Sequence, residues 1–237
     1  VAAQPLLFMA LPFGFYQARN IVLSATPKDV DVQPLQTVDD LLSYLPQQFV
    51  TSMKNLVDNF ALNDETDDVD DEKKSLLKNV VDQINSKNNF ITLRAFIAYL
   101  TAPLSNLKQS DVIEETTAFN LLSVVLDIVP PEIVLAIVNL LIDKLRSDSS
   151  RETNAFIRLV LALLKIKVKR SGIGEVIARV IFERASAPPP HPSGLINIIK
   201  ELTNERNNIL LELPLSSQNR SVIAFLNAAR TAFQARK

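Results

Sequence analysis

The sequence contains no cysteine and no tryptophan, and it has only 1 histidine and 4 glycines. The absence of cysteine excludes disulfides, thiolate zinc sites and thiol nucleophiles. A single histidine excludes metal sites that need several imidazole ligands. So few glycines argue against a β-rich fold, because such a fold needs many tight turns. The catalytic classes that stay open are enzymes that use a serine with a lysine, or carboxylates.

The 237-residue chain also lacks a strong net charge and a long apolar run. Its formal net charge of −1 creates no overall field to attract nucleic acid or an anionic membrane. The longest apolar runs, at 133–138 and 159–164, are too short to span a bilayer, so we expect no membrane association. Because the first residue is Val1 and residues 1–15 lack a basic segment, we expect a fragment of a longer chain without a signal peptide.

Residues 175–202 are predicted to form two short amphipathic helices joined by a rigid corner. The prolines at 188–190 end the first helix, because proline lacks the N–H donor and clashes with the preceding turn. We expect His191 to cap the second helix and Pro192 to occupy its first position, where a missing N–H is tolerated. Within the first helix, Arg179 is spaced to pair with an acidic residue four positions away.

Apolar residues recur at helical spacing along most of the chain, and prolines mark the corners. Ser110 is predicted to cap the helix that follows it, with Asp111 and Glu114 in its first turn. The segments 132–146 and 153–168 are apolar nearly all round, which predicts that neighbouring helices cover them. The expected helices cover residues 1–25 with a break near Pro12 and Gly14, then 38–45, 46–60, 73–85, 90–100, 111–126, 132–146, 153–168, 175–186, 191–203 and 218–236.

These helices recur as pairs, at 111–146, 150–186 and 191–236, with a period near that of α-solenoid repeats. No residue signature repeats between the pairs, so the repetition is architectural. The fold class is therefore predicted to be all-α, a HEAT-like stack of helical hairpins forming a single domain over residues 1–237.

Residues 61–73 include a strongly acidic run, NDETDDVDDE at 63–72. Acidic runs can bind calcium, but an EF-hand loop needs a central glycine, and this run contains none. We therefore expect a mobile acidic loop and no metal site.

Two other patterns have both a functional and a structural interpretation. The lone Gly172-Ile173-Gly174 follows no predicted strand and is interpreted as a helix break, not as a phosphate loop. Basic clusters occur at 165–170 and near the C-terminus. They would contact RNA weakly or serve as solvated helix ends, and no aromatic residues for base stacking are interleaved with them. Their members are Lys165, Lys167, Lys169 and Arg170, and Arg230, Arg236 and Lys237.

Three motifs, in order along the chain, resemble the C-terminal domain of the large Not scaffold subunit of the CCR–NOT messenger-RNA deadenylase complex. Residues 190–195, PHPSGL, preceded by IFER at 181–184, are similar to the family pattern LLER followed by PHPWGLL. QARNIVLSATP at 17–27 resembles LRNLILSAFP, and LPQQF at 45–49 resembles PPQF. Ser193 stands where the family usually has tryptophan, which indicates a divergent member.

The resemblance implies a HEAT-like domain with no catalytic activity and no cofactor, located in the cytoplasm and also in the nucleus. It implies two kinds of partner, namely the smaller Not-box subunits of the complex and translational repressor peptides. An RNA-binding helical module and a carboxylate-based helical enzyme are the alternatives, and a deep pocket gathering acidic side chains would favour the enzyme.

The proline corner at 188–192 fixes the angle between two amphipathic helices, and a fixed groove between helices suits an extended arm or a partner helix. We therefore predict the protein-binding site around this corner. Its predicted members are Phe182, His191, Pro192, Leu195 and Ile196.

Overall fold

The computed structural model describes residues 37–61, 71–86, 90–146, 150–167, 172–185 and 192–203, together with 227, 228 and 231. Contacts divide the chain into one unit of residues 1–37 and another of residues 38–237, and the architecture below is that of the second unit. The helix expected at 1–25 lies outside the described residues, as does nearly all of the one at 218–236.

The described part of the chain folds into nine α-helices and three 3₁₀ helices and contains no strand, which confirms the all-α prediction. The first helices occupy the segments that apolar periodicity indicates. In order, the elements are α2 (Val38–Ser43), α3 (Gln47–Ala61), α4 (Asp71–Ser86), α5 (Phe90–Thr101), η1 (Ala102–Asn106), η2 (Ile113–Glu115), α6 (Thr117–Ile128), α7 (Pro131–Asp143), η3 (Lys144–Arg146), α8 (Ser150–Lys167), α9 (Ile173–Ala185) and α10 (Ser193–Leu202).

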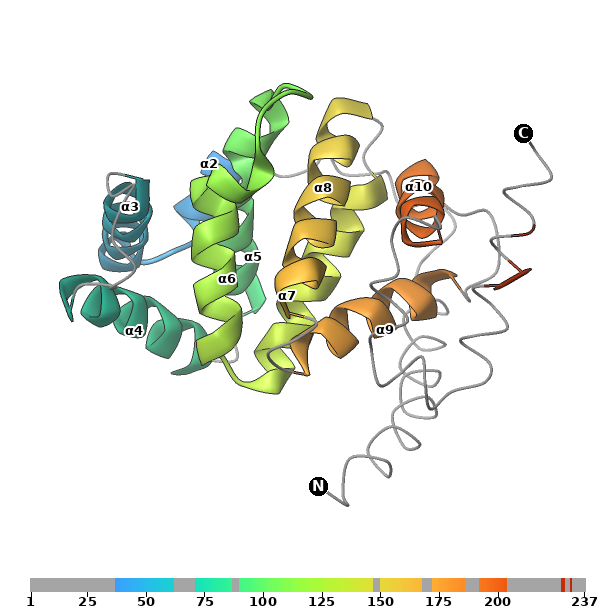
Figure 1. Cartoon of the computed structure of the whole chain (residues 1–237). Coiled ribbons are helices and arrows are strands. Elements are labelled where there is room, and N and C mark those ends of the chain that lie inside the picture. Colours follow the sequence, from blue (N-terminus) through green and yellow to red (C-terminus); the bar gives the residue numbers. More distant parts are fainter. Residues whose placement is uncertain are drawn as a thin grey trace, which may run out of the picture. The chain divides into compact units, whose positions relative to one another are not determined.

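Successive helices from α5 onward alternate between two layers of a stack (Figure 1). One layer contains α2, α5, α7 and α9, each packed against the next. The other contains α3, α6, α8 and α10, also packed in that order. Consecutive helices such as α8 and α9 pack across the two layers. This arrangement is the helical stack that the paired pattern of the sequence predicts.

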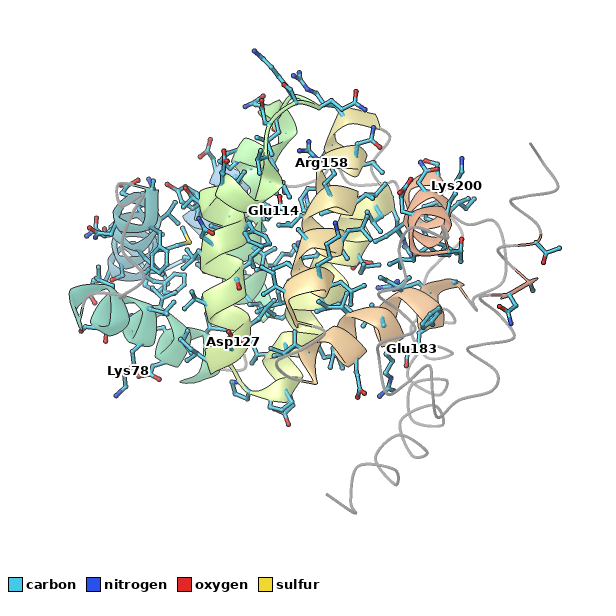
Figure 2. The ribbon with its side chains drawn as sticks, viewed as in Figure 1. Lys78, Glu114, Asp127, Arg158, Glu183 and Lys200 are labelled. Carbon is cyan, nitrogen blue, oxygen red and sulfur yellow. The ribbon has the colours of Figure 1, made fainter. Side chains whose placement is uncertain are left out.

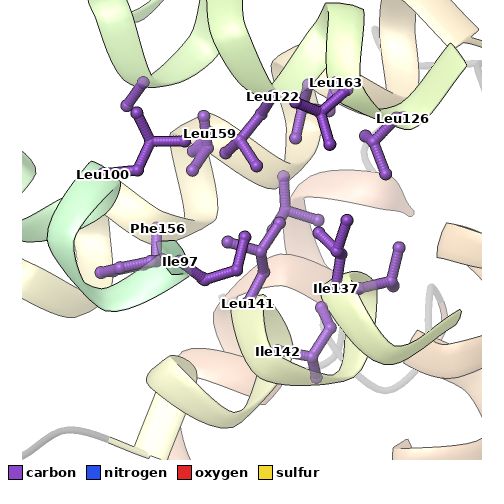
Figure 3. Close-up of a cluster of buried hydrophobic side chains, with 14 of the residues drawn as sticks. Ile97, Leu100, Leu122, Leu126, Ile137, Leu141, Ile142, Phe156, Leu159 and Leu163 are labelled. Carbon is purple, nitrogen blue, oxygen red and sulfur yellow. The ribbon is translucent and has the colours of Figure 1, made fainter. Parts of the chain in front are cut away.

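The core lies between the layers, where aliphatic side chains from α5, α6, α7 and α8 meet (Figure 3). Ile97, Leu122, Ile137 and Leu159 come from these four helices in turn, and all are buried. Helix α8 packs against α6, α7, α9, α10 and all three 3₁₀ helices. Helix α7 packs against α5, α8, α9 and η3. Neighbouring elements therefore cover much of 132–146 and of 153–167, as predicted, although Ile133 and Leu140 of α7 remain partly exposed.

Helix α6 begins later than expected, because its N-cap is Thr116 and not Ser110. The Thr116 hydroxyl accepts a hydrogen bond from the Phe119 N–H at 3.2 Å. Ser110 lies in an exposed turn, where the carboxylate of Asp111 accepts the Lys108 N–H at 2.7 Å. The prediction of Ser110 as the cap was wrong, since this local turn competes with the helix for the same residues.

Helix α4 begins at Asp71, two residues before its expected start, so part of the predicted acidic loop 61–73 is helical. Ala61 likewise belongs to α3. Residues 62–70 lie outside the described residues, so the loop itself stays a prediction.

The helix break predicted at 172–174 lies at Gly172, the turn residue directly before α9 begins at Ile173, whereas Gly174 is buried within α9. The prediction for the residues that begin α10 needs correction. Pro192 is the N-cap of α10 and not its first residue, and its carbonyl accepts the Leu195 N–H at 3.1 Å. An extended proline with φ −58° and ψ 143° orients that carbonyl without a side-chain cap. The role expected of His191 therefore falls to Pro192, and His191 lies outside the described residues.

Candidate docking surface at helices α9 and α10

Helix α9 is fixed on the stack by an apolar face and by one polar link to α7. Ile177 and Ile181 are buried. Near the end of the helix, the Arg184 guanidinium donates to Asp143 Oδ1 at 2.8 Å and to Asn139 Oδ1 at 3.3 Å. Because both acceptors lie on α7, this arginine sets how α9 lies against its neighbour in the layer.

The outer side of α9 contains the expected i,i+4 ion pair. Arg179 Nε donates to Glu183 Oε1 at 2.7 Å, and both side chains are partly exposed. In Figure 2, Glu183 lies on the side of α9 that faces away from the core, and Lys200 lies on the outer side of α10. A surface ion pair of this kind contributes only about 0.3–0.5 kcal/mol to the free energy of unfolding, so it adds little to stability.

Helix α10 packs against η3, α8 and α9 through one strongly apolar face. Leu195, Ile198 and Leu202 are all buried and recur at positions i, i+3 and i+7 of that face. Gly194 brings the backbone of α10 close to its neighbours. A Cβ added there would lie 2.5 Å from the carbonyl oxygen of Leu145 and 2.5 Å from Thr153 Cγ2.

The structure divides the five predicted protein-binding residues by accessibility. Ile196 is exposed, with 39% of its surface accessible, and Pro192 is partly exposed. Phe182 is partly buried and packs against the core cluster. Leu195 is only 4% exposed and belongs to the core, so a partner cannot reach it directly. His191 lies outside the described residues.

A segment on another side of α8 contains contacts that the sequence did not suggest. Residues 106–111 include the last residue of η1 and most of its connection to η2, and Arg151 and Arg158 of α8 donate to backbone carbonyls in this segment. Arg151 Nε reaches the Leu107 oxygen at 3.2 Å, and Arg158 Nη1 reaches the Lys108 oxygen at 3.1 Å, with Nη2 on the Asp111 oxygen. Figure 2 shows Arg158 and Glu114 in the region between α6 and α8. The two arginines stand seven residues apart, a spacing that places them on one face of a helix.

The basic cluster predicted at 165–170 is described only in part. Lys165 is exposed near the end of α8, beside the partly exposed Ile166. Lys167 is the last residue of that helix, and Lys169 and Arg170 lie outside the described residues. A cation at a helix C-terminus also interacts favourably with the helix dipole, so weak RNA contact stays a prediction.

Two further features of the described residues concern metal binding and membrane crossing. Among them, no group of three or more His, Asp or Glu side chains is placed to hold a metal ion. None of the helices described has the length and apolar character needed to cross a bilayer.

A protein-family model described as "CCR4-Not complex component, Not1" matches residues 1–229. The chain belongs to the Not1 family. This assignment agrees with the three motifs at 17–27, 45–49 and 181–195, and it makes the chain a Not1 domain of the CCR4-Not complex, which implies a scaffold role. A search of the curated proteins found no match.

The fold of this chain is also similar to that of a solved structure, the NOT1 superfamily homology domain from Chaetomium thermophilum. The TM-score is 0.61 at 18% sequence identity, and the match covers 91% of this chain and 47% of that chain. At this identity the likeness shows the fold alone. The chain spans about half the length of the solved domain that it matches.

Proposed function

We propose that this Not1 chain is a non-catalytic docking domain that holds the two smaller Not-box subunits of the CCR4-Not complex, using residues 1–237 as one functional unit. It would need no cofactor. Translational repressor peptides would reach the complex through the same domain, in the cytoplasm and in the nucleus. Membership in the Not1 family supports this proposal, because that family is a component of the complex.

The observation that carries the proposal is the exposed isoleucine on α10. Ile196 is 39% exposed, whereas Leu195, Ile198 and Leu202 of the same helix are buried. It lies on a helix that packs against α9, where Phe182 is partly accessible. Partly accessible apolar side chains on two rigidly packed helices suit a partner helix or an extended arm.

The accessible members of the predicted site are therefore Phe182, Pro192 and Ile196. Replacing the buried Leu195 would test the core and not the surface. A charged residue at Ile196, in contrast, would face water in the free domain and meet the apolar part of the partner in the complex. Burying an unpaired charge in this way is costly, so binding weakens while the free domain stays folded.

The test is co-purification of the domain with the two smaller Not subunits of the same organism. We expect Ile196→Glu to reduce capture by about tenfold or more, the factor that corresponds to roughly 1.4 kcal/mol of binding free energy. The matched control is Ile128→Glu. It places the same charge on another isoleucine, 51% exposed at the end of α6, and should leave capture unchanged.

Two results would contradict the proposal. If the wild-type domain fails to capture the subunits, the docking function is wrong. If both glutamate variants bind like the wild type, docking occurs at a different surface. Circular dichroism of each variant confirms that the helices are intact before binding is compared.

A further inference from the structure

The close approach at Gly194 lies between two residues of the proposed docking surface. Pro192 stands two residues before it and Ile196 two residues after it. The atoms that a Cβ would meet are the Leu145 oxygen and Thr153 Cγ2, each at 2.5 Å, and Leu145 Cβ at 3.1 Å. The first of these is a backbone atom of η3, so it cannot turn aside as the end of a flexible side chain could.

The contact determines where the N-terminal end of α10 lies. Three elements hold this helix, namely η3, α8 and α9. Leu145 belongs to η3 and Thr153 to the first turn of α8, and both are buried. A side chain at position 194 would therefore have to push α10 away from two elements that are themselves packed into the core.

We propose that Gly194 is a positioning residue of the docking surface, since the missing side chain lets α10 approach η3 and α8 closely and so determines where Pro192 and Ile196 of the same segment lie. This inference rests on the proposed docking function. It assigns a binding role to a residue that is itself buried and that a partner does not touch.

A purely stabilising glycine would behave differently from a positioning one. If Gly194 only allowed closer packing, replacing it would change the melting temperature but not the affinity of the folded domain for its partner. A positioning residue changes the affinity at temperatures well below melting, because α10 remains helical but is displaced. The dissociation constant and the melting temperature are therefore both measured for the same preparation of each variant and compared.

The experiment titrates the smaller Not subunits into the Gly194→Ala domain and measures the affinity by calorimetry, at a temperature well below melting. We expect affinity to fall by about tenfold, a loss of roughly 1.4 kcal/mol. Hydrogen exchange should rise within 193–202 and stay unchanged in α3. The control is Leu56→Ala, a fully buried residue of α3, which packs on α4 and α6. It should lower the melting temperature and keep wild-type affinity.

A second-site variant keeps the test decisive. Thr153→Ser keeps the hydroxyl and removes the Cγ2 methyl that the new Cβ would meet, so Gly194→Ala with Thr153→Ser should recover part of the lost affinity. This double variant also replaces Gly194→Ala if that variant folds poorly.

The outcomes separate this inference from the docking function. If Ile196→Glu loses binding but folded Gly194→Ala binds like the wild type, the docking surface stands and the positioning role is overturned. If folded Gly194→Ala loses binding and Ile196→Glu does not, the docking surface does not include Ile196, and the inference that Gly194 acts by positioning Ile196 is overturned. If both variants bind like the wild type, both proposals are wrong.

Discussion

At the scale of single residues, one position along a helix decides whether a side chain is core or surface. Leu195 and Ile196 are adjacent, yet the first is 4% and the second 39% exposed. Consecutive residues of a helix point about 100° apart, so an apolar pair at the edge of a stripe divides in this way. Both residues were predicted as binding residues, because their apolar character alone does not give the orientation of the helix.

Truncating the buried member tests this division. We expect Leu195→Ala to lower the free energy of unfolding by about 2–5 kcal/mol, because it leaves a cavity under α10. Ile196→Ala should change it by about 1 kcal/mol or less, since much of that side chain is already in water. Urea denaturation followed by circular dichroism measures both values. Equal losses for the two variants would show that the two side chains are equally buried.

A second residue-scale prediction concerns Tyr99 on α5. Burial raises the pKa of the Tyr99 hydroxyl, and the negative charge of Asp58 on α3 raises it further. The folded state thus favours the neutral phenol. This contribution to stability is complete below the usual tyrosine pKa of about 10 and is lost as the pH rises through the higher folded value.

We expect Asp58→Asn to shift the titration of Tyr99 to lower pH, because it removes one of the two causes. Phenolate absorbance, measured as the difference from the same protein with Tyr99→Phe, isolates this group from the other tyrosines. A titration that is unchanged by Asp58→Asn would mean that burial acts alone.

At the scale of elements, the sequence predicted which segments are helical but not how their ends are held. Helical periodicity located α7, α9 and α10 closely, since each has a continuous apolar face. The start of α6 was missed because the 106–111 segment is held by Arg151 and Arg158, 40 or more residues later in the chain. A contact between distant segments leaves no local signal, and only the seven-residue spacing of the arginines hints at it.

The arginine contacts predict local rather than global effects. Replacing Arg158 with methionine keeps much of its apolar stem but removes the donors to the carbonyls of Lys108 and Asp111. Because hydrogen bonds to charged groups contribute about 1.5–3 kcal/mol, we expect a loss at the lower end of that range at this partly exposed site. Hydrogen exchange should increase mainly within 107–112. A matched change at the exposed Arg94 of α5 should leave that segment unaffected.

At the scale of the whole molecule, the composition predicted that the chain has no overall electrostatic attraction to nucleic acid or to an anionic membrane. The numbers of acidic and basic residues are nearly equal, which gives the chain a net charge of −1. Electrostatic attraction to RNA therefore has to come from a local cluster of basic residues such as 165–170. The fold class and the family followed from helical periodicity and from three motifs. The accessibility of the predicted docking residues did not, because it depends on packing between elements far apart in sequence.

This charge balance gives a prediction for RNA. We expect the isolated domain to bind single-stranded RNA weakly, since few phosphates would be neutralised. Because such binding is electrostatic, it should weaken further between about 50 and 200 mM salt. Filter binding across that range, with Lys165→Glu as the variant and Lys78→Glu of α4 as the control, measures the effect. Tight binding at low salt that falls steeply as salt rises, and that Lys165→Glu weakens, would contradict this expectation and favour the RNA-binding alternative.

The alternation of helices between two layers constrains how this lineage can change in length. From α5 to α10, each helix packs against the one two positions further along. Gain or loss of a single helix would move every later helix into the opposite layer and turn its apolar face away from the core. Additions by duplication should therefore occur in pairs of helices, whereas single insertions should fall in the connections. Homologues that differ by an odd number of helices would need a compensating long connection to restore the pattern.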